Sequence, residues 1–250
     1  MFWLAIKQSR TSLLLVAGTL FAVLVGALLT TPMMNVVWAE SGMAGCTVGC
    51  EVAAANLFEL TSGSLVEYFT IVPTLLMPFA IIAFPFVFGA QAVGKDLEDG
   101  VQRLAWLQST TRSKWLAAKI AVALGVAIIS IASLQLIWLF WGRRLVAAGA
   151  FLGHALPFGQ FAFGINSMIN TVFGIALAIL LSLMFRSVVG AGLAAVVGLG
   201  IVPELVHRSL AWLLAGSAAT AATTWVANGF ILLLAAIAIA LAFRKIQRID

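Results

Sequence analysis

The chain has 250 residues, of which 63% are hydrophobic and 9% are charged, and its mean hydropathy is +1.12. Soluble domains carry about 25% charged residues, and one of this length could not bury so much apolar surface. The composition excludes a soluble globular protein and predicts an all-α polytopic membrane protein. The net charge of +5 does not indicate nucleic-acid binding, because the basic residues flank apolar runs, where they usually set topology.

The N-terminal residues predict an interfacial helix that leads into the first span. Residues 1–10 place two aromatic side chains beside Lys7 and Arg10, which suits a short helix lying on the membrane surface; a plain aromatic anchor is the alternative. Residues 11–31 then match the roughly 20 residues that cross a bilayer, and Pro32 is expected to end this span. The run is too long for the apolar core of a signal peptide, about 7–15 residues, so we expect a retained span.

Residues 33–65 are predicted to form the first loop. The loop contains three glutamates but no lysine or arginine, and it holds Cys46 and Cys50. Two cysteines cannot supply a zinc or iron–sulfur site. On the outer side of the membrane they are free to form a disulfide, which we favour over a redox or metal role.

The second span, about 66–93, contains three prolines. Because Pro73, Pro78 and Pro85 each remove a backbone hydrogen bond, this span is expected to be bent or broken. Packing against neighbouring helices can satisfy the carbonyl groups that the prolines leave free.

Four more spans complete a single transmembrane domain over residues 1–250. They are predicted at about 116–141, 160–185, 188–202 and 226–243, with a loop at 142–159. Arg186 and Ser187 form a tight turn, and Pro203 is expected to end the fifth span. Residues 209–225 are rich in small side chains and too short to cross twice, so they predict an outward re-entrant or interfacial hairpin.

The distribution of basic residues predicts the orientation. With six spans, most lysines and arginines gather on one side, and only Arg143, Arg144 and Arg208 fall on the other. The positive-inside rule therefore places both termini in the cytoplasm of a multi-pass plasma-membrane protein.

The longest charged interruption of the apolar sequence is the segment from Gly89 to Lys119. It is expected in water, because each charge in lipid costs about 2.5–3.5 kcal/mol. Its start, Gly89–Lys95, matches the phosphate-binding pattern GxxxxGK, but Asp96 follows where that pattern needs serine or threonine. We therefore expect no nucleotide site in this chain. We also expect no catalytic residue, cofactor or metal, because the sequence has no nucleophile motif, paired catalytic carboxylates or metal-ligand spacing.

The same segment has the pattern of a docking helix. Acidic residues come first, a Ser-Thr-Thr cap follows, and large apolar residues such as Trp106 and Trp115 are interspersed with basic ones. A short amphipathic helix with aromatic anchors suits a groove on another protein. A solvated loop whose tryptophans rest at the lipid headgroups is the alternative.

The run GKDLEDGVQRLAWLQSTTRSKWLAAKI resembles the cytosolic loop of ABC-2 type transporter permeases, especially short actinobacterial-style subunits. Asp96 and Val101 depart from the usual Glu and Thr of that pattern. The resemblance implies a coupling helix that docks on a separate cytosolic ABC ATPase, which would bind ATP and Mg. It also implies a second permease copy or paralogue. The ATPase interface implied by the matching stretch comprises Asp96, Glu98, Gly100, Arg103, Leu104, Trp106, Gln108, Arg112, Trp115 and Lys119.

Polar residues inside the spans are candidates for a translocation path or a dimer interface. Asn166 and Asn170 lie four apart and so share one helix face, and Gln135 lies in the third span. Polar faces in membranes usually look inward. Interhelical hydrogen bonding alone is the alternative reading of all three residues.

The sequence therefore favours the permease subunit of an ATP-driven exporter that carries an amphipathic, lipid-like or drug-like substrate. Two alternatives remain open. One is a channel or secondary transporter without an ATPase, although the spans lack the mid-membrane charges that such proteins usually need. The other is a membrane scaffold or immunity protein that only binds a partner.

Overall fold

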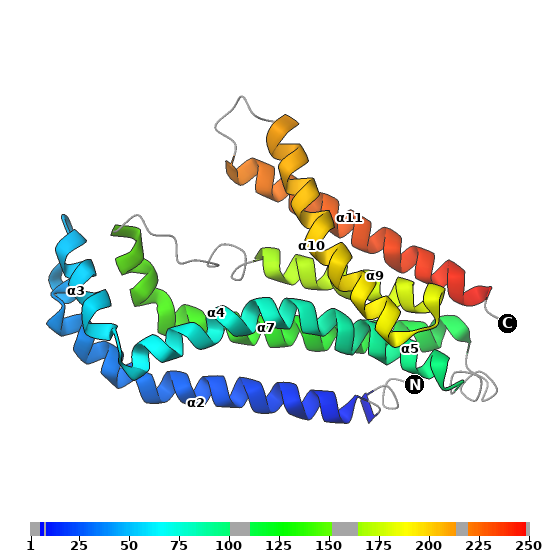
Figure 1. Cartoon of the computed structure of the whole chain (residues 1–250), viewed down its shortest axis with the longest axis horizontal. Helices are drawn as coiled ribbons and strands as arrows, with labels where there is room; N and C mark the ends of the chain where they lie inside the picture. The colour runs from blue at the N-terminus through cyan, green and yellow to red at the C-terminus, as the bar shows by residue number, and fades with distance from the viewer. Residues whose placement is uncertain (1–5, 8, 101–110, 152–164, 214–219, 249–250) are drawn as a thin grey trace. The chain divides into compact units, whose positions relative to one another are not determined.

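The computed structural model describes residues 6–7, 9–100, 111–151, 165–213 and 220–248, and these form helices and turns without strands (Figure 1). Six described helices are long and apolar enough to cross a membrane, so the prediction of a multi-pass α-helical membrane protein is confirmed. The elements in chain order are α2 (Arg10–Glu40), η1 (Met43–Gly45), α3 (Glu51–Thr61), α4 (Leu65–Phe84), η2 (Pro85–Ala90), α5 (Gln91–Glu98), α7 (Arg112–Phe151), α9 (Ile165–Phe185), α10 (Val188–Leu213) and α11 (Thr220–Gln247).

Two prolines that were expected to end spans lie inside helices. α2 continues through Pro32 to Glu40, and α10 continues through Pro203 to Leu213, so both predicted ends are wrong. A proline removes one backbone hydrogen bond, but in an apolar setting the remaining backbone groups still have to be paired, which favours continuing the helix.

Two predicted loops are largely helical. The segment 33–65 holds the end of α2, then η1 and α3, and it is not a loop. α7 runs to Phe151, so Arg143 and Arg144 are helical residues, and residues 152–164 lie outside the described part. Charged residues at the ends of long helices were mistaken for loop residues, because a helix can extend beyond the hydrocarbon.

The predicted interfacial helix, hairpin and charged segment lie only partly within the described residues. Of the predicted interfacial helix, residues 1–5 and 8 lie outside the described residues, and Arg10 already begins α2. Of the predicted hairpin, residues 209–213 belong to α10 and residues 220–225 belong to α11, while residues 214–219 lie outside. The charged segment 89–119 is helical at both flanks, in η2, α5 and α7, and residues 101–110 lie outside.

The second span departs from α geometry at one of its prolines. α4, η2 and α5 follow one another without a break, and η2 is a π-helix that begins at Pro85. The N–H of Gln91 donates to the carbonyl of Phe86, five residues earlier. Such π-helical turns are rare and usually short, and they are frequent at functional sites.

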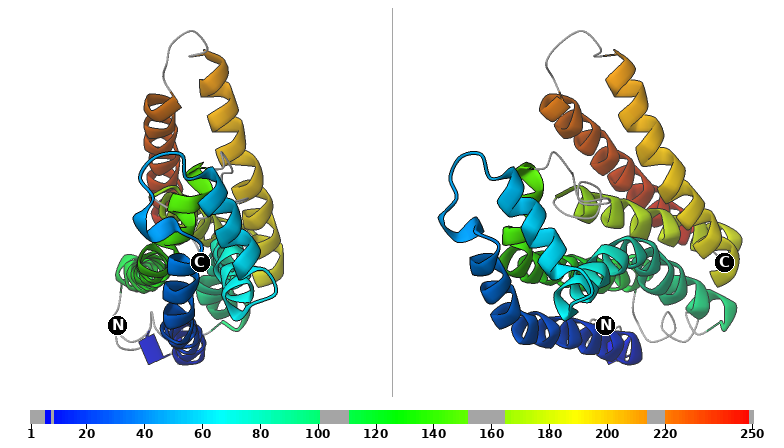
Figure 2. Two further views of the ribbon diagram at one scale, coloured as in Figure 1. Left: turned by 90° about the vertical axis from the view of Figure 1, so that its left-hand side faces the viewer. Right: turned by 60° about the vertical axis from the view of Figure 1, so that its left-hand side comes forward.

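The chain divides into two compact units. Unit 1 comprises Met1–Leu13, Ala80–Ile129 and Ile165–Asp250. Within it α9 packs against α10, α11 and η2. The ribbons of α9, α10 and α11 lie side by side in Figures 1 and 2. Its apolar core includes Ile169, Phe173 and Ile231.

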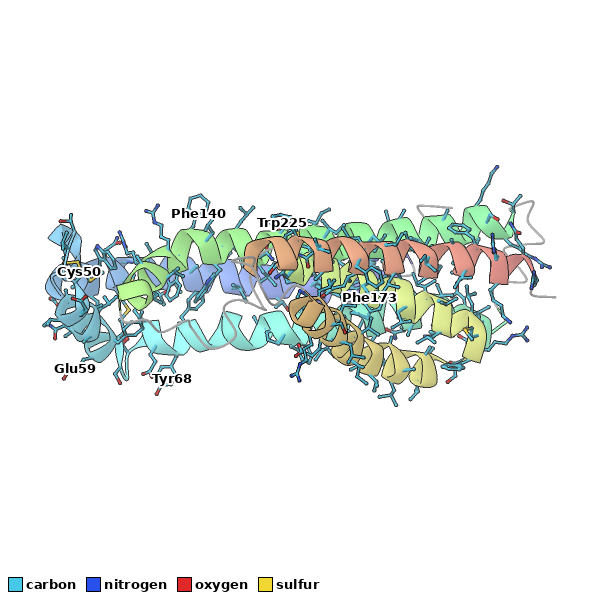
Figure 3. All side chains as sticks on the ribbon, turned by 90° about the horizontal axis from the view of Figure 1, so that it is seen from above. Cys50, Glu59, Tyr68, Phe140, Phe173 and Trp225 are labelled. Carbon is cyan, nitrogen blue, oxygen red and sulfur yellow. A yellow bond between two sulfur atoms is a disulfide. The ribbon has the colours of Figure 1, made fainter. Side chains whose placement is uncertain are left out.

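Unit 2 comprises Leu14–Phe79 and Ser130–Gly164. Its core gathers Met34, Leu57, Trp138 and Trp141 from α2, α3 and α7. Cys46 and Cys50 form a disulfide with a Cα–Cα distance of 5.8 Å, seen as a yellow bond beside the Cys50 label in Figure 3. The disulfide closes the turn between η1 and α3, and Cys50 is fully buried against the core of this unit.

Candidate functional site

The candidate site is the basic end of unit 1, which we define as the end of α5, the start of α7, the α9–α10 turn and the end of α11. Hydrogen bonds and an ion pair join these four places to one another. The exposed basic side chains described at this end include Lys95, Lys114, Arg186, Arg244, Lys245 and Arg248. Such a cationic surface beside membrane spans is where a soluble, negatively charged surface would be attracted.

A buried ion pair joins α5 to α7 at this end. Lys119 Nζ lies 3.0 Å from Asp96 Oδ2, and the two side chains are only 6% and 13% exposed. The ammonium group also lies 5.9 Å from the centre of the buried Trp115 ring, within cation–π range. A pair so shielded from water holds the two helices in one register, because separating the charges would leave each of them buried and uncompensated.

The start of α7 is capped and anchored. The Thr111 hydroxyl oxygen accepts a hydrogen bond from the Lys114 N–H at 3.3 Å, as an N-cap residue does. The next residue, Arg112, donates from Nη1 to the carbonyl of Gln247 at 3.3 Å. This bond satisfies a carbonyl at the end of α11, where a cation is favourable for the helix dipole.

A second tertiary contact joins α5 to α10. Glu98 Oε1 accepts a hydrogen bond from the N–H of Val188 at 2.7 Å, so a side chain 90 residues away caps the first residue of α10. Ser187 Oγ accepts from the Gly190 N–H at 3.3 Å. A carboxylate at this position is favoured both by the free N–H groups and by the positive end of the helix dipole.

Two glycines allow this arrangement. A Cβ on Gly94 would lie 3.1 Å from Val188 Cγ2 and 3.3 Å from Val188 Cα, so its absence lets α5 approach the start of α10. Gly100 has φ of +70°, the left-handed conformation that commonly follows a helix end. The helix α5 therefore ends at Glu98, two residues before Gly100, and residues 101–110 lie outside the described residues.

The structure brings part of the predicted interface together. Asp96, Glu98, Arg112, Trp115 and Lys119 all lie at the basic end, and Gly100 lies at its edge. The remaining predicted interface residues, Arg103, Leu104, Trp106 and Gln108, lie outside the described residues. The contacts of Val188 and Gln247 were not predicted, because both involve backbone groups, which carry no residue-type signal.

The polar residues predicted inside the spans fall in different units. Gln135 lies on α7 in unit 2, whereas Asn166 and Asn170 lie on α9 in unit 1. Asn166 Oδ1 accepts a hydrogen bond from Asn228 Nδ2 of α11 at 2.6 Å. Asn228 was missed in the sequence, since it stands in α11 without another asparagine or glutamine one turn away along that helix.

Comparison with known proteins identifies a family. A family model described as ABC-2 membrane transporter related matches residues 16–212, a range that includes most of α2 and nearly all of α10. No curated protein and no solved structure matches the chain. The described residues contain no group of three or more histidine, cysteine, aspartate or glutamate residues that could hold a metal ion.

Proposed function

The chain belongs to the ABC-2 membrane transporter related family, and from this premise we propose that it is the membrane-spanning subunit of an ATP-driven exporter. Members of this family are transmembrane components of transporters. The family match confirms the resemblance to ABC-2 type permeases that the charged segment indicated. In our proposal a separate cytosolic subunit binds ATP and Mg and hydrolyses the nucleotide, and this chain catalyses no reaction itself.

The observation that carries the proposal is the bonding at the basic end of unit 1. The segment between Gly100 and Thr111 leaves one helix and enters another. Its two flanks are held together by the ion pair of Asp96 with Lys119, and one flank caps α10 through Glu98. A force applied to this segment would therefore act on α5, α7 and α10 together.

We propose that this is how ATP binding moves the spans. Closure of two ATPase subunits would displace the segment at residues 101–110, and the Asp96–Lys119 and Glu98–Val188 contacts would transmit the displacement to three helices. A movement of this kind is a shift between two states of a packed bundle, driven by a ligand bound to another subunit. The transporter would contain two membrane subunits, a second copy of this chain or a paralogue.

The proposed orientation follows from the basic side chains at the same end. Lys95, Lys114, Lys245 and their neighbours would face the cytoplasm of the plasma membrane by the positive-inside rule. An amphipathic, lipid-like or drug-like substrate is the class proposed, because the spans are strongly apolar.

Co-purification from the native membrane tests the proposal. The tagged chain is extracted in mild detergent, and the proteins that accompany it are identified by mass spectrometry. Lys114→Glu reverses an exposed charge at the basic end, and Arg143→Glu makes the same change near the other end of α7. We expect a soluble ATPase with the native chain and with Arg143→Glu, and at least a tenfold lower recovery with Lys114→Glu.

A properly inserted chain that brings no ATPase with it would contradict the proposal and favour a channel or a scaffold. Equal recovery with both variants would contradict the location of the interface, but not the existence of the complex. The two outcomes are separated by the same experiment.

A further inference from the structure

Three asparagines form a polar group inside the apolar bundle of unit 1, with Asn228 buried and Asn166 and Asn170 half-buried. We call Asn166, Asn170 and Asn228 the asparagine cluster. Asn166 and Asn170 lie one turn apart on α9, and Asn228 of α11 is bonded to Asn166 at 2.6 Å. Ile169, which precedes Asn170, and Ile231, three residues after Asn228, belong to the apolar core between the same two helices.

The hydrogen bonding of this cluster is incomplete. Asn228 is only 3% exposed, and its Oδ1 has no hydrogen-bond partner among the described residues. Asn170 Oδ1 is likewise enclosed and without a partner among them. The nearby Thr171 hydroxyl cannot serve either oxygen, because it donates to the carbonyl of Ser167 at 2.8 Å.

Two enclosed acceptors without donors are unfavourable in an apolar bundle. Buried polar groups in proteins are nearly always paired, and those that are not usually indicate a ligand, an ion or a functional role. Here both unmatched atoms are amide oxygens. The group that would complete the cluster must therefore supply hydrogen-bond donors, as a hydroxyl or a protonated amine does.

We propose that the asparagine cluster binds the polar end of the transported molecule, and that this end is a hydrogen-bond donor. Asn228 Oδ1 and Asn170 Oδ1 accept from the hydroxyl or ammonium group, while the apolar chain of the molecule lies along the core side chains of α9 and α11. Both oxygens are enclosed, so entry requires these two helices to separate. This inference rests on the proposed transport function and specifies its substrate class.

Thermal unfolding of the purified full chain tests the inference without an ATPase. The probes are two matched pairs with the same eight-carbon chain: 1-octanol with methyl octyl ether, and octylamine with trimethyl(octyl)ammonium. Only the first member of each pair has a donor. We expect at least one donor to raise Tm by about 2–4 °C more than its donor-free counterpart, the size of shift given by a saturating ligand. A response to the amine alone identifies an ammonium group, and a response to the alcohol alone identifies a hydroxyl group.

Three variants make the test specific. Asn228→Leu and Asn170→Leu each remove one of the two oxygens, and either should abolish the difference between donor and donor-free probes. Asn56→Leu makes the same change at an exposed position of α3 and should preserve the difference. If Asn228→Leu does not fold, the difference in Tm shift between donor and donor-free probes is tested with Asn170→Leu alone.

Equal shifts with both members of each pair, or no shift with any probe, would overturn the inference, as would a difference that persists in both cluster variants. Such results would leave the transport function intact, because that function is judged by co-purification with an ATPase.

Discussion

Asp96 and Lys119 carry opposite charges at a place where both are shielded from water. A charge in such surroundings is stable only with a partner, so each of the two residues determines the environment of the other. The pair also fixes which turn of α5 faces which turn of α7. The exposed pair of Glu204 and Arg208 on α10 shows the opposite situation, with side chains 48% and 78% exposed.

Neutralising one member of the buried pair should lower the free energy of unfolding more than neutralising both members. We expect Lys119→Met or Asp96→Leu to lower the free energy of unfolding by about 3–5 kcal/mol, because each leaves an unpaired buried charge. The double variant should recover most of the loss. Thermal unfolding in detergent measures these differences, and a double-mutant cycle gives the coupling between the two residues.

The control for this prediction is Arg208→Met, which removes one partner of the exposed pair. Exposed pairs one helical turn apart contribute only about 0.3–0.5 kcal/mol, so its Tm should stay close to that of the native chain. Additive effects of the two substitutions in the buried pair would argue against an energetic coupling at the basic end.

The cap of α10 by Glu98 leads to a second prediction. Glu98→Ala removes the acceptor of the Val188 N–H, and caps contribute about 0.5–2 kcal/mol to stability. Glu98→Gln retains a side-chain oxygen and should lose less. If the contact transmits motion as proposed, Glu98→Ala should also reduce ATP-driven transport while ATPase co-purification is unchanged. Loss of the ATPase from Glu98→Ala would indicate a docking role instead.

The charged residues of the basic end could be predicted from the sequence, but the groups to which they bond could not. Asp96, Glu98 and Lys119 stood out as charges between apolar spans. Their particular contacts depend on which helix ends meet, and Glu98 meets a backbone group 90 residues away. Asn228 was missed for a related reason, since its partner is 62 residues away on another helix and its own helix gives no periodic polar pattern.

The elements η2 and α9 pack closely against each other. A Cβ on Gly89 would lie 2.6 Å from Ala178 Cβ and 3.2 Å from the Ile175 carbonyl oxygen, and one on Gly174 would lie 2.6 Å from Pro85 Cγ. Small residues at such crossings let membrane helices pack backbone to backbone. The packing of these two elements therefore depends on glycine at both positions.

A third prediction concerns this crossing. Gly89→Ala should destabilise the chain by about 1–3 kcal/mol, because the added methyl group overlaps Ala178 and the helix backbone. Gly125→Ala is the matched control in α7, where nothing lies within 4 Å of the added Cβ. That variant should be neutral or more stable by at most about 1 kcal/mol, reflecting helix propensity. Equal Tm values for the two variants would contradict close packing of η2 on α9.

The number of elements was predicted better than their ends. All six spans follow from apolar runs of sufficient length, and the turn at residues 186–187 is present as expected. The ends near Pro32 and Pro203 were wrong because proline was treated as a terminator. In a bundle surrounded by lipid, a helix that accommodates the proline leaves fewer backbone groups unpaired than an early end does.

At the scale of the whole molecule, the proposed topology can be tested by labelling. Both cysteines of the sequence are joined in the disulfide, so the native chain should not react with a maleimide and serves as the background. We expect Lys114→Cys and Lys245→Cys to resist a membrane-impermeant maleimide in intact cells and to react after permeabilisation. Arg143→Cys and Arg208→Cys should react in intact cells. Labelling of Lys245→Cys in intact cells would reverse the proposed orientation.

The π-helix η2 has a consequence for the helix that follows it. A π turn holds about one residue more than an α turn, so conversion of Pro85–Ala90 to α geometry would rotate α5 about its own axis by roughly 100°, the angle of one residue. Asp96 and Glu98 would then turn away from Lys119 and Val188 together. A change of helix geometry confined to η2 would therefore break the Asp96–Lys119 and Glu98–Val188 contacts in a single rotation of α5.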